Sequence, residues 1–123
     1  MTELFRCSAT EMARLMRDKV VSPVEVIKSH LGRIEQVNPI LNAITDFQAD
    51  RALKQARHAE KKIMAKDSVG RLQGVPLTIK SSIEVEGFRC ECGTKIRKGI
   101  VAQRDATVVS SLKNAGAIIL GTT

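Results

Sequence analysis

Val75-Pro76-Leu77-Thr78-Ile79-Lys80 is the stretch on which the fold depends. Its apolar residues Val75, Leu77 and Ile79 occupy every second position, and this period of two predicts a β-strand. Downstream, Ala117-Ile118-Ile119-Leu120 is apolar at every position, as strands are when a parallel sheet buries both of their faces. Two strands of one sheet that are joined by a crossover with a helix lie parallel. We therefore expect an α/β fold.

A loop and then a helix are predicted between these strands. Residues 87–104 hold glycines and several charges, which indicates a long loop. Asp105 suits the N-cap of the helix that follows, and Gly116 suits its C-terminal end. Two parallel strands cannot form a sheet that is covered on both faces, so we expect the opening strands of a large mixed sheet. The isolated chain should then expose an edge of the strand at 117–120 and self-associate.

Upstream of residue 66 the sequence predicts helices. The Ser-x-x-Glu pattern of a capping box begins at Ser8 and again at Ser22, where Pro23 takes the first helical position. We expect Asn38-Pro39 to end the second helix, because the residue before a proline avoids the helical conformation, and residues 40–45 to be extended. Spacings of three and four give this helix one apolar stripe, made of Val24, Ile27, Leu31 and Ile34.

A third amphipathic helix is predicted over residues 49–63, and its polar face is basic. The formal net charge of the chain is +7, which raises the alternative of nucleic-acid binding. No aromatic residues alternate with the cations to stack on bases, so we favour a solvated helix face. The cations suit the outer face of a helix: Arg51, Lys54, Arg57, Lys61, Lys62 and Lys66.

The cysteines suggest neither a disulfide framework nor a metal site. Cys7, Cys90 and Cys92 are odd in number, and Cys90-Glu91-Cys92 has no second pair. His30 and His58 fall on separate predicted helices, so we expect incidental thiols and no metal. Reduced thiols favour a cytoplasmic protein. No signal peptide or membrane span is predicted, because the apolar runs are too short.

Lys80 is the one residue whose chemistry suggests catalysis. A lysine that is removed from water can become a neutral base, take a proton from a serine hydroxyl and so create a nucleophile. The alternative is that Lys80 faces water, because it falls on the polar positions of the alternating strand. Residue chemistry alone favours this alternative. Ser81 would point to the opposite face, and Ser82 has no oxyanion-hole motif beside it, so neither is assigned as a nucleophile.

The sequence around Lys80 belongs to a longer pattern that resembles the amidase-signature family. Residues 72–80, Leu-Gln-Gly-Val-Pro-Leu-Thr-Ile-Lys, match the Leu-x-Gly-Val/Ile-Pro-x-x-Ile-Lys segment of that family. The resemblance covers nearly the whole chain, from about Ser8 to Thr123. Further matching segments follow the order of the family: Ser22-Pro23-Val24-Glu25, residues 33–43, Gly87, Gly93-Thr94, Asp105-Ala106-Thr107-Val108-Val109, Leu112 and residues 115–121.

This resemblance implies a Ser–Ser–Lys amidohydrolase. In the family a distal serine attacks an amide or ester carbonyl to give an acyl-enzyme, and the lysine relays protons through a second serine, which is held by a cis peptide. By its matching position, Lys80 takes the role of the catalytic lysine. Both serines belong to a Gly/Ser-rich stretch with no counterpart here. Ser81 stands where many members have Asp, which leaves the hydrogen bonding of Lys80 open.

We therefore expect residues 1–123 to be the N-terminal part of a single amidase-signature domain, mainly helical over 1–66 and strand–loop–helix–strand over 72–123. Its partners would be the remainder of that domain and a small-molecule amide, without cofactor or metal, and the chain alone would be inactive. The A subunit of the glutamyl/aspartyl-tRNA amidotransferase is an alternative, and only then is nucleic acid an expected partner. A homodimer, and a complete non-enzymatic binding module or relic, stay open as further alternatives.

Overall fold

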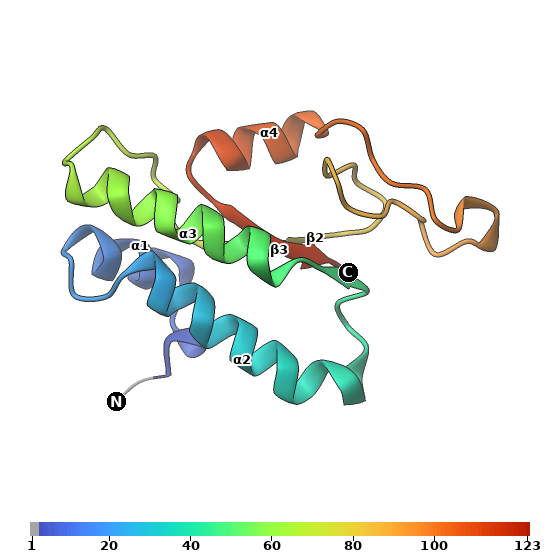
Figure 1. Cartoon of the computed structure of the whole chain (residues 1–123), viewed down its shortest axis with the longest axis horizontal. Coiled ribbons are helices and arrows are strands. Elements are labelled where there is room, and N and C mark those ends of the chain that lie inside the picture. Colours follow the sequence, from blue (N-terminus) through green and yellow to red (C-terminus); the bar gives the residue numbers. More distant parts are fainter. Residues whose placement is uncertain (1–2) are drawn as a thin grey trace.

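The computed structural model describes residues 3–123, and helices and a small sheet make up this part of the chain (Figure 1). Short 3-10 helices lie at Leu4–Arg6 and Lys95–Arg97. The main elements, in chain order, are α1 (Ala9–Arg17), α2 (Pro23–Leu41), β1 (Asp46–Phe47), α3 (Ala49–Met64), β2 (Pro76–Ile79), α4 (Thr107–Asn114) and β3 (Ile118–Thr122).

The strands form one mixed sheet in the order β1-β3-β2. β3 pairs in parallel with β2, as predicted, and antiparallel with β1, a short strand that the sequence pattern does not reveal. Gly121 permits the pairing with β1, because a Cβ atom at this position would lie 2.4 Å from the carbonyl oxygen of Asp46. The expectation of an unpaired edge at 117–120 is therefore wrong: β3 is the central strand, and all of its residues are buried.

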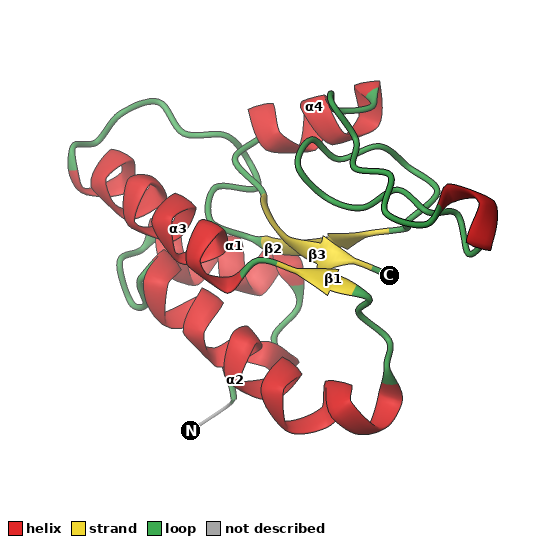
Figure 2. Ribbon diagram, turned by 45° about the vertical axis from the view of Figure 1, so that its right-hand side comes forward, coloured by secondary structure: helices red, strands yellow, loops and turns green. Residues whose placement is uncertain are grey.

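Helices cover both faces of the sheet (Figure 2). On one face, Ile118 and Leu120 of β3 pack against the apolar sides of α2 and α3. On the other face, Ile119 packs with Val109 of α4 and with Phe88 from the loop after β2. Because successive side chains of a strand point to opposite faces, β3 contributes to both apolar clusters. The expected α/β fold is confirmed.

The predicted starts of the first two helices are confirmed. The Ser22 hydroxyl accepts a hydrogen bond from the Glu25 N–H at 3.1 Å, and the Glu25 carboxylate accepts one from the Ser22 N–H at 2.8 Å. Pro23 follows at the first helical position of α2. At α1, the Ser8 hydroxyl accepts from the Glu11 N–H at 3.2 Å, but the reciprocal bond does not form among residues 3–123. α2 therefore has a complete capping box and α1 has half of one.

The prediction that Asn38-Pro39 ends the second helix is wrong. α2 continues through Pro39 to Leu41, and Asn42 caps it in the left-handed conformation at φ 47°. Since Pro39 lies in the last turn, it removes only one intrahelical hydrogen bond. The Asn38 side chain stabilises this end by donating to the Ile44 carbonyl and accepting from the Ile44 N–H, both at 2.9 Å. The extended stretch that follows is therefore shorter than expected.

Asp105 does not cap α4, contrary to the prediction, and Ala106 is the N-cap residue. The Asp105 carboxylate instead accepts hydrogen bonds from Lys113 Nζ at 2.7 and 2.9 Å and from the Glu86 N–H at 2.8 Å. A bond to a charged ammonium is stronger than a cap to a neutral amide, which explains the preference. Burial raises the pKa of the Asp105 carboxyl, but Lys113, the Glu86 N–H and Arg51 together outweigh burial and hold this pKa below its usual value.

Residues 87–104 form the long loop that the sequence predicts, and the two ends of this loop pair with each other. Arg89 lies opposite Val101 in an isolated antiparallel bridge, and the Cys90 N–H donates to the Ile100 carbonyl at 2.8 Å. Near the tip of the loop, Ile96 is 93% exposed. Figure 1 shows this segment, in orange, extending away from the sheet.

Candidate functional site

Lys80 follows β2 directly, at the carboxyl end of the strand. Its side chain is exposed, as is that of Thr78, whereas Ile79 between them is buried in the cluster under α4. The alternation of β2 therefore continues through Lys80, whose side chain lies on the sheet face turned away from α4. In this structure Lys80 faces water, which is the alternative that residue chemistry favours.

Backbone hydrogen bonds fix the chain on both sides of Lys80. The Thr123 N–H donates to the Ile79 carbonyl at 2.9 Å, and the Ser81 N–H donates to the Thr123 carbonyl at 2.8 Å. The Ile83 N–H then donates to the Lys80 carbonyl at 2.9 Å and closes a turn. Lys80 is thus held beside the end of β3, where both parallel strands have their carboxyl ends. This edge is the usual place for ligands in open α/β sheets.

Within residues 3–123, no serine is hydrogen-bonded to the side chain of Lys80. Among the hydrogen bonds and ion pairs of residues 3–123, none involves the Lys80 ammonium. Ser81 is half-buried and Ser82 is exposed. A general base and its nucleophile need to lie about 2.6–3.2 Å apart. The described residues therefore supply a candidate base without a nucleophile.

Thr122 is a polar residue at the same end of the sheet that the sequence pattern does not single out. It pairs with Ile79, is fully buried, and its Oγ1 has no hydrogen-bond partner within residues 3–123. Such a hydroxyl costs free energy, because burial removes the water to which it would otherwise bond. The signal in the sequence is a threonine two positions after the apolar run at 117–120, at a position that the continuing strand buries.

Helices on both faces of the sheet hold the segment that follows Lys80. From α3, the Arg51 guanidinium donates to the Glu86 carbonyl at 2.8 Å and lies 5.1 Å from the centre of the Phe88 ring. From the other side, Asp105 binds the Glu86 N–H and is itself paired with Lys113 of α4. The turn after β2 is therefore anchored by charged side chains rather than by further strand pairing.

Thiols and carboxylates do not gather into a metal site in the described part of the chain. Cys90 is buried and Cys92 is exposed, and both are free thiols. Burial, together with the neighbouring Cys92, raises the pKa of the Cys90 thiol, and Arg97 offsets this rise only in part. None of the helices within residues 3–123 combines the length and the apolar character that crossing a membrane requires.

Known proteins resemble this chain in sequence and in fold. The model of the amidase family matches residues 25–123. The A subunit of the glutamyl-tRNA(Gln) amidotransferase of Acidothermus cellulolyticus is 39% identical, over 100% of this chain and 24% of that protein. Indoleacetamide hydrolase of Bradyrhizobium diazoefficiens is also 39% identical, over 98% of this chain and 23% of the relative. A bacterial aryl acylamidase of the amidase signature family superposes with a TM-score of 0.86 at 30% identity, over 95% and 25% of the two chains.

The chain spans about a quarter of the length of these relatives, namely their N-terminal part. The relatives have different names but share this part of the fold, so the match identifies a family and not one activity. The matched residues run from α2 to the end of β3 and include Lys80 with its turn. The chain belongs to the amidase-signature family.

Proposed function

We propose that the protein containing this chain hydrolyses a non-peptide carboxylic amide by a Ser–Ser–Lys acyl-enzyme mechanism, with Lys80 as its lysine. The observation that carries the proposal is the position of Lys80, at the end of the family's Gly-Val-Pro-x-x-Ile-Lys segment and at the carboxyl end of β2. Two relatives are named as an indoleacetamide hydrolase and an aryl acylamidase, which supports an amide C–N bond as the target.

The mechanism consists of two acyl transfers, the first to a serine and the second to water. The neutral Lys80 amine takes a proton from a bridging serine, which takes the proton of the nucleophilic serine, whose oxygen bonds to the amide carbon. The C–N bond then breaks, and the proton returns to the leaving nitrogen. Water hydrolyses the acyl ester by the same route and frees the serine. Since no serine of this chain takes either role, the mechanism requires the remainder of an amidase-signature domain as partner.

The exposure of Lys80 agrees with this requirement. A lysine that acts as a general base near neutral pH has to be sheltered from water. Thr78 and Lys80 share an exposed face of β2, on which the remainder of the domain would provide both the shelter and the serines.

The test compares the 123-residue chain with the full-length protein that contains it. Both are incubated with a panel of aryl amides and esters, and release of the amine or alcohol is measured. We expect turnover by the full-length protein and none by the chain alone, which lacks the nucleophile and the oxyanion donors. Turnover by the chain alone that disappears in Lys80→Met would place the nucleophile within it and overturn the proposal. So would a full-length protein that hydrolyses no amide.

A second candidate is the A subunit of a tRNA-dependent amidotransferase, which releases ammonia from glutamine or asparagine for a partner protein. The observation in its favour is the 39% identity over the whole chain to such a protein of Acidothermus cellulolyticus. Purification of the full-length protein from its source distinguishes the two candidates. Copurification of tRNA and a second subunit, together with ammonia release that needs them, would favour the amidotransferase. Hydrolysis of aryl amides by the isolated protein would favour the amidase.

A further inference from the structure

A groove of about 570 Å³ lies between α3 and α4, and we call it the basic groove. Its walls carry cations and amides, and no carboxylate is among the residues that line it. It lies away from the Lys80 edge of the sheet, because it is lined by Gly116, Ala117 and Ile118, at the start of β3. The polar lining from the two helices is Arg51, Lys54, Gln55, His58 and Lys62 of α3 and Lys113 and Asn114 of α4.

Two lysines in the basic groove have no negative partner within residues 3–123. Lys113 is paired with Asp105 at 2.7 Å, so its charge is compensated. Arg51 donates hydrogen bonds only to uncharged groups, namely a backbone carbonyl and an amide oxygen, but its charge also acts on the Asp105 carboxyl and lowers the pKa of that group. Lys54 and Lys62 are exposed and take part in none of the ion pairs within residues 3–123. These two lysines therefore attract anions into the groove.

Two lysines of α3 and the histidine between them lie in a row. Lys54, His58 and Lys62 are spaced by four residues within α3, which places them on one slanted line of the helix surface. At 1.5 Å per residue, the row from Lys54 to Lys62 is about 12 Å long. Beyond the last residue of α3, Met64, Lys66 lines a pocket that adjoins the groove.

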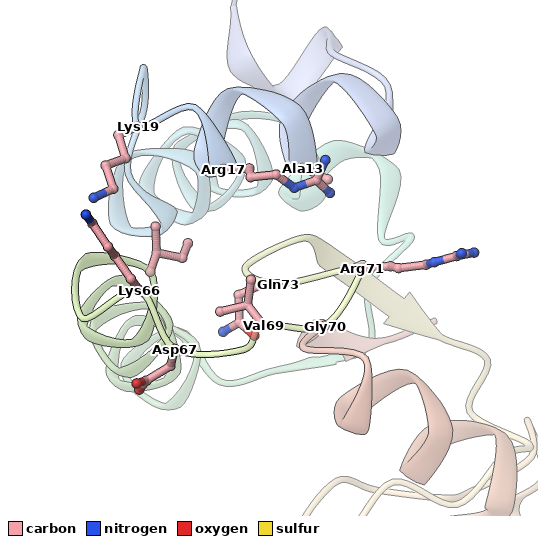
Figure 3. A pocket seen from close by; sticks show the side chains of 10 residues that line it. Ala13, Arg17, Lys19, Lys66, Asp67, Val69, Gly70, Arg71 and Gln73 are labelled. Carbon is pink, nitrogen blue, oxygen red and sulfur yellow. The ribbon is translucent and has the colours of Figure 1, made fainter.

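This adjoining pocket, of about 240 Å³, is also basic (Figure 3). It shares Gly70 and Gln73 with the basic groove. Figure 3 shows the ammonium groups of Lys19 and Lys66 pointing toward one another at its edge, whereas the Asp67 carboxylate points away. Like charges that face one another repel. An anion bound between the two lysines would relieve this repulsion.

We propose that the basic groove and the adjoining pocket bind the phosphodiester backbone of a nucleic-acid strand. A linear series of phosphates matches two adjoining pockets, one with a row about 12 Å long and the other with Lys19 and Lys66, whereas one small phosphate compound would occupy a single pocket. None of the residues that line the two pockets is aromatic, so the contacts are to phosphates and not to stacked bases. The binding is therefore independent of base sequence. It does not depend on the proposed amidase activity.

The test measures binding of the 123-residue chain to a fluorescent 20-nucleotide single strand by anisotropy, over a series of salt concentrations. A groove variant removes two lysines of the row and Lys66 of the adjoining pocket, and a control variant removes three exposed lysines that line neither pocket. The groove variant is Lys54→Ala, Lys62→Ala and Lys66→Ala, and the control variant is Lys28→Ala, Lys95→Ala and Lys98→Ala. All six side chains are exposed, so both variants should fold, which circular dichroism verifies.

We expect the groove variant to lose about 100-fold in affinity at 0.1 M salt, and its slope of log K against log salt to become shallower by about 2. The control variant should bind as the unmodified chain does. Equal losses in both variants would mean that net charge alone attracts the strand and would overturn the proposal. It would also be overturned by stoichiometric binding of tripolyphosphate without binding of the strand, or by binding of anionic lipid vesicles in preference to the strand.

Discussion

At Lys80, the chemistry depends on what surrounds one amine. The backbone on both sides is fixed by hydrogen bonds to Thr123, yet the side chain has water as its neighbour in the described structure. The position of the Lys80 side chain and its reactivity therefore depend on different parts of the protein. The strand end and its turn provide the position, and under the proposed mechanism the remainder of the domain provides the reactivity.

Substitution of Lys80 in the full-length protein tests its role as a base. Lys80→Ala and Lys80→Arg should each lower the rate of acyl-enzyme formation on an activated ester by about 10²–10⁴, because neither side chain can accept the proton. The fold should persist, since this side chain is exposed. A burst assay over a range of pH measures the rate, with Lys95→Ala, an exposed lysine of the long loop, as the matched control. If Lys80→Arg is acylated at close to the wild-type rate, Lys80 supplies only a positive charge and does not act as a base.

Asp105 joins two segments through charge, so its substitution should destabilise the chain. Asp105→Asn removes the negative partner of Lys113, and we expect a loss of about 2 kcal/mol in the free energy of unfolding, as for hydrogen bonds to charged groups. Urea denaturation measures this loss. Lys113→Met and the double variant complete a mutant cycle. A coupling energy near zero would show that the pair contributes nothing.

The Asp105 carboxyl also makes the stability of the folded chain depend on pH, and its pKa determines the direction of the change. Its pKa is lowered in the folded chain, so between the folded and unfolded values the unfolded state binds more protons. The contribution to stability is complete above the unfolded pKa, about 3.9, and is lost as the pH falls through the folded value. Asp105→Asn should remove this part of the acid destabilisation. If the variant loses as much stability at low pH as the unmodified chain does, Asp105 is not a source of the acid destabilisation.

At the scale of elements, the complete capping box of α2 can be compared with the half box of α1. Ser22→Ala removes a hydroxyl that accepts from the Glu25 N–H and also disturbs the reciprocal bond, so we expect a loss of about 1 kcal/mol. Ser8→Ala is the matched control and should cost less, because only one bond is lost. Thermal unfolding of both variants measures the difference. A larger loss for Ser8→Ala would contradict the role of the reciprocal bond.

Local patterns predicted the elements well where local contacts determine them. The capping residues Ser8 and Ser22 start helices, and the uniformly apolar run at 117–120 is a buried strand, as predicted. The errors arose where a contact with a residue outside the immediate turn competes with a local rule. Asn38 binds Ile44 and so permits a helix through Pro39, and Asp105 binds Lys113 instead of capping α4. β1 is defined by its pairing with β3, and a strand of two residues is too short to be predicted from periodicity.

The candidate site was predictable only in part, for the same reason. The motif ending at Lys80 identifies the residue, and the structure adds its exposure and its contact with the end of β3. The buried hydroxyl of Thr122 and the basic groove arise from packing between elements, so they cannot be predicted from the sequence of one segment. The basic residues of α3 suggest a solvated face in the sequence, because the sequence does not show that α4 forms the opposite wall.

For the molecule as a whole, the central position of β3 changes the expected behaviour of the isolated chain. An exposed edge at 117–120 would favour self-association, but β3 is paired on both sides and covered on both faces. The free edges within residues 3–123 belong to β1 and to the outer side of β2. β2 is short, begins at Pro76 and is followed by Lys80, two residue types that discourage edge pairing.

Because β3 contributes to the apolar clusters on both faces, its side chains should determine the global stability of the chain. Leu120 is 3% exposed and packs against α2 and α3, so Leu120→Ala should cost about 2–5 kcal/mol in the free energy of unfolding. Ile96→Ala, at a position that is 93% exposed, is the control and should change stability by less than about 0.5 kcal/mol. Hydrogen exchange adds a second measurement, since the amides of β3 should exchange last and only through global unfolding. If the β3 amides exchange as fast as those of the 87–104 loop, the strand is not the centre of the cooperative unit, and its two clusters stabilise separate parts of the chain.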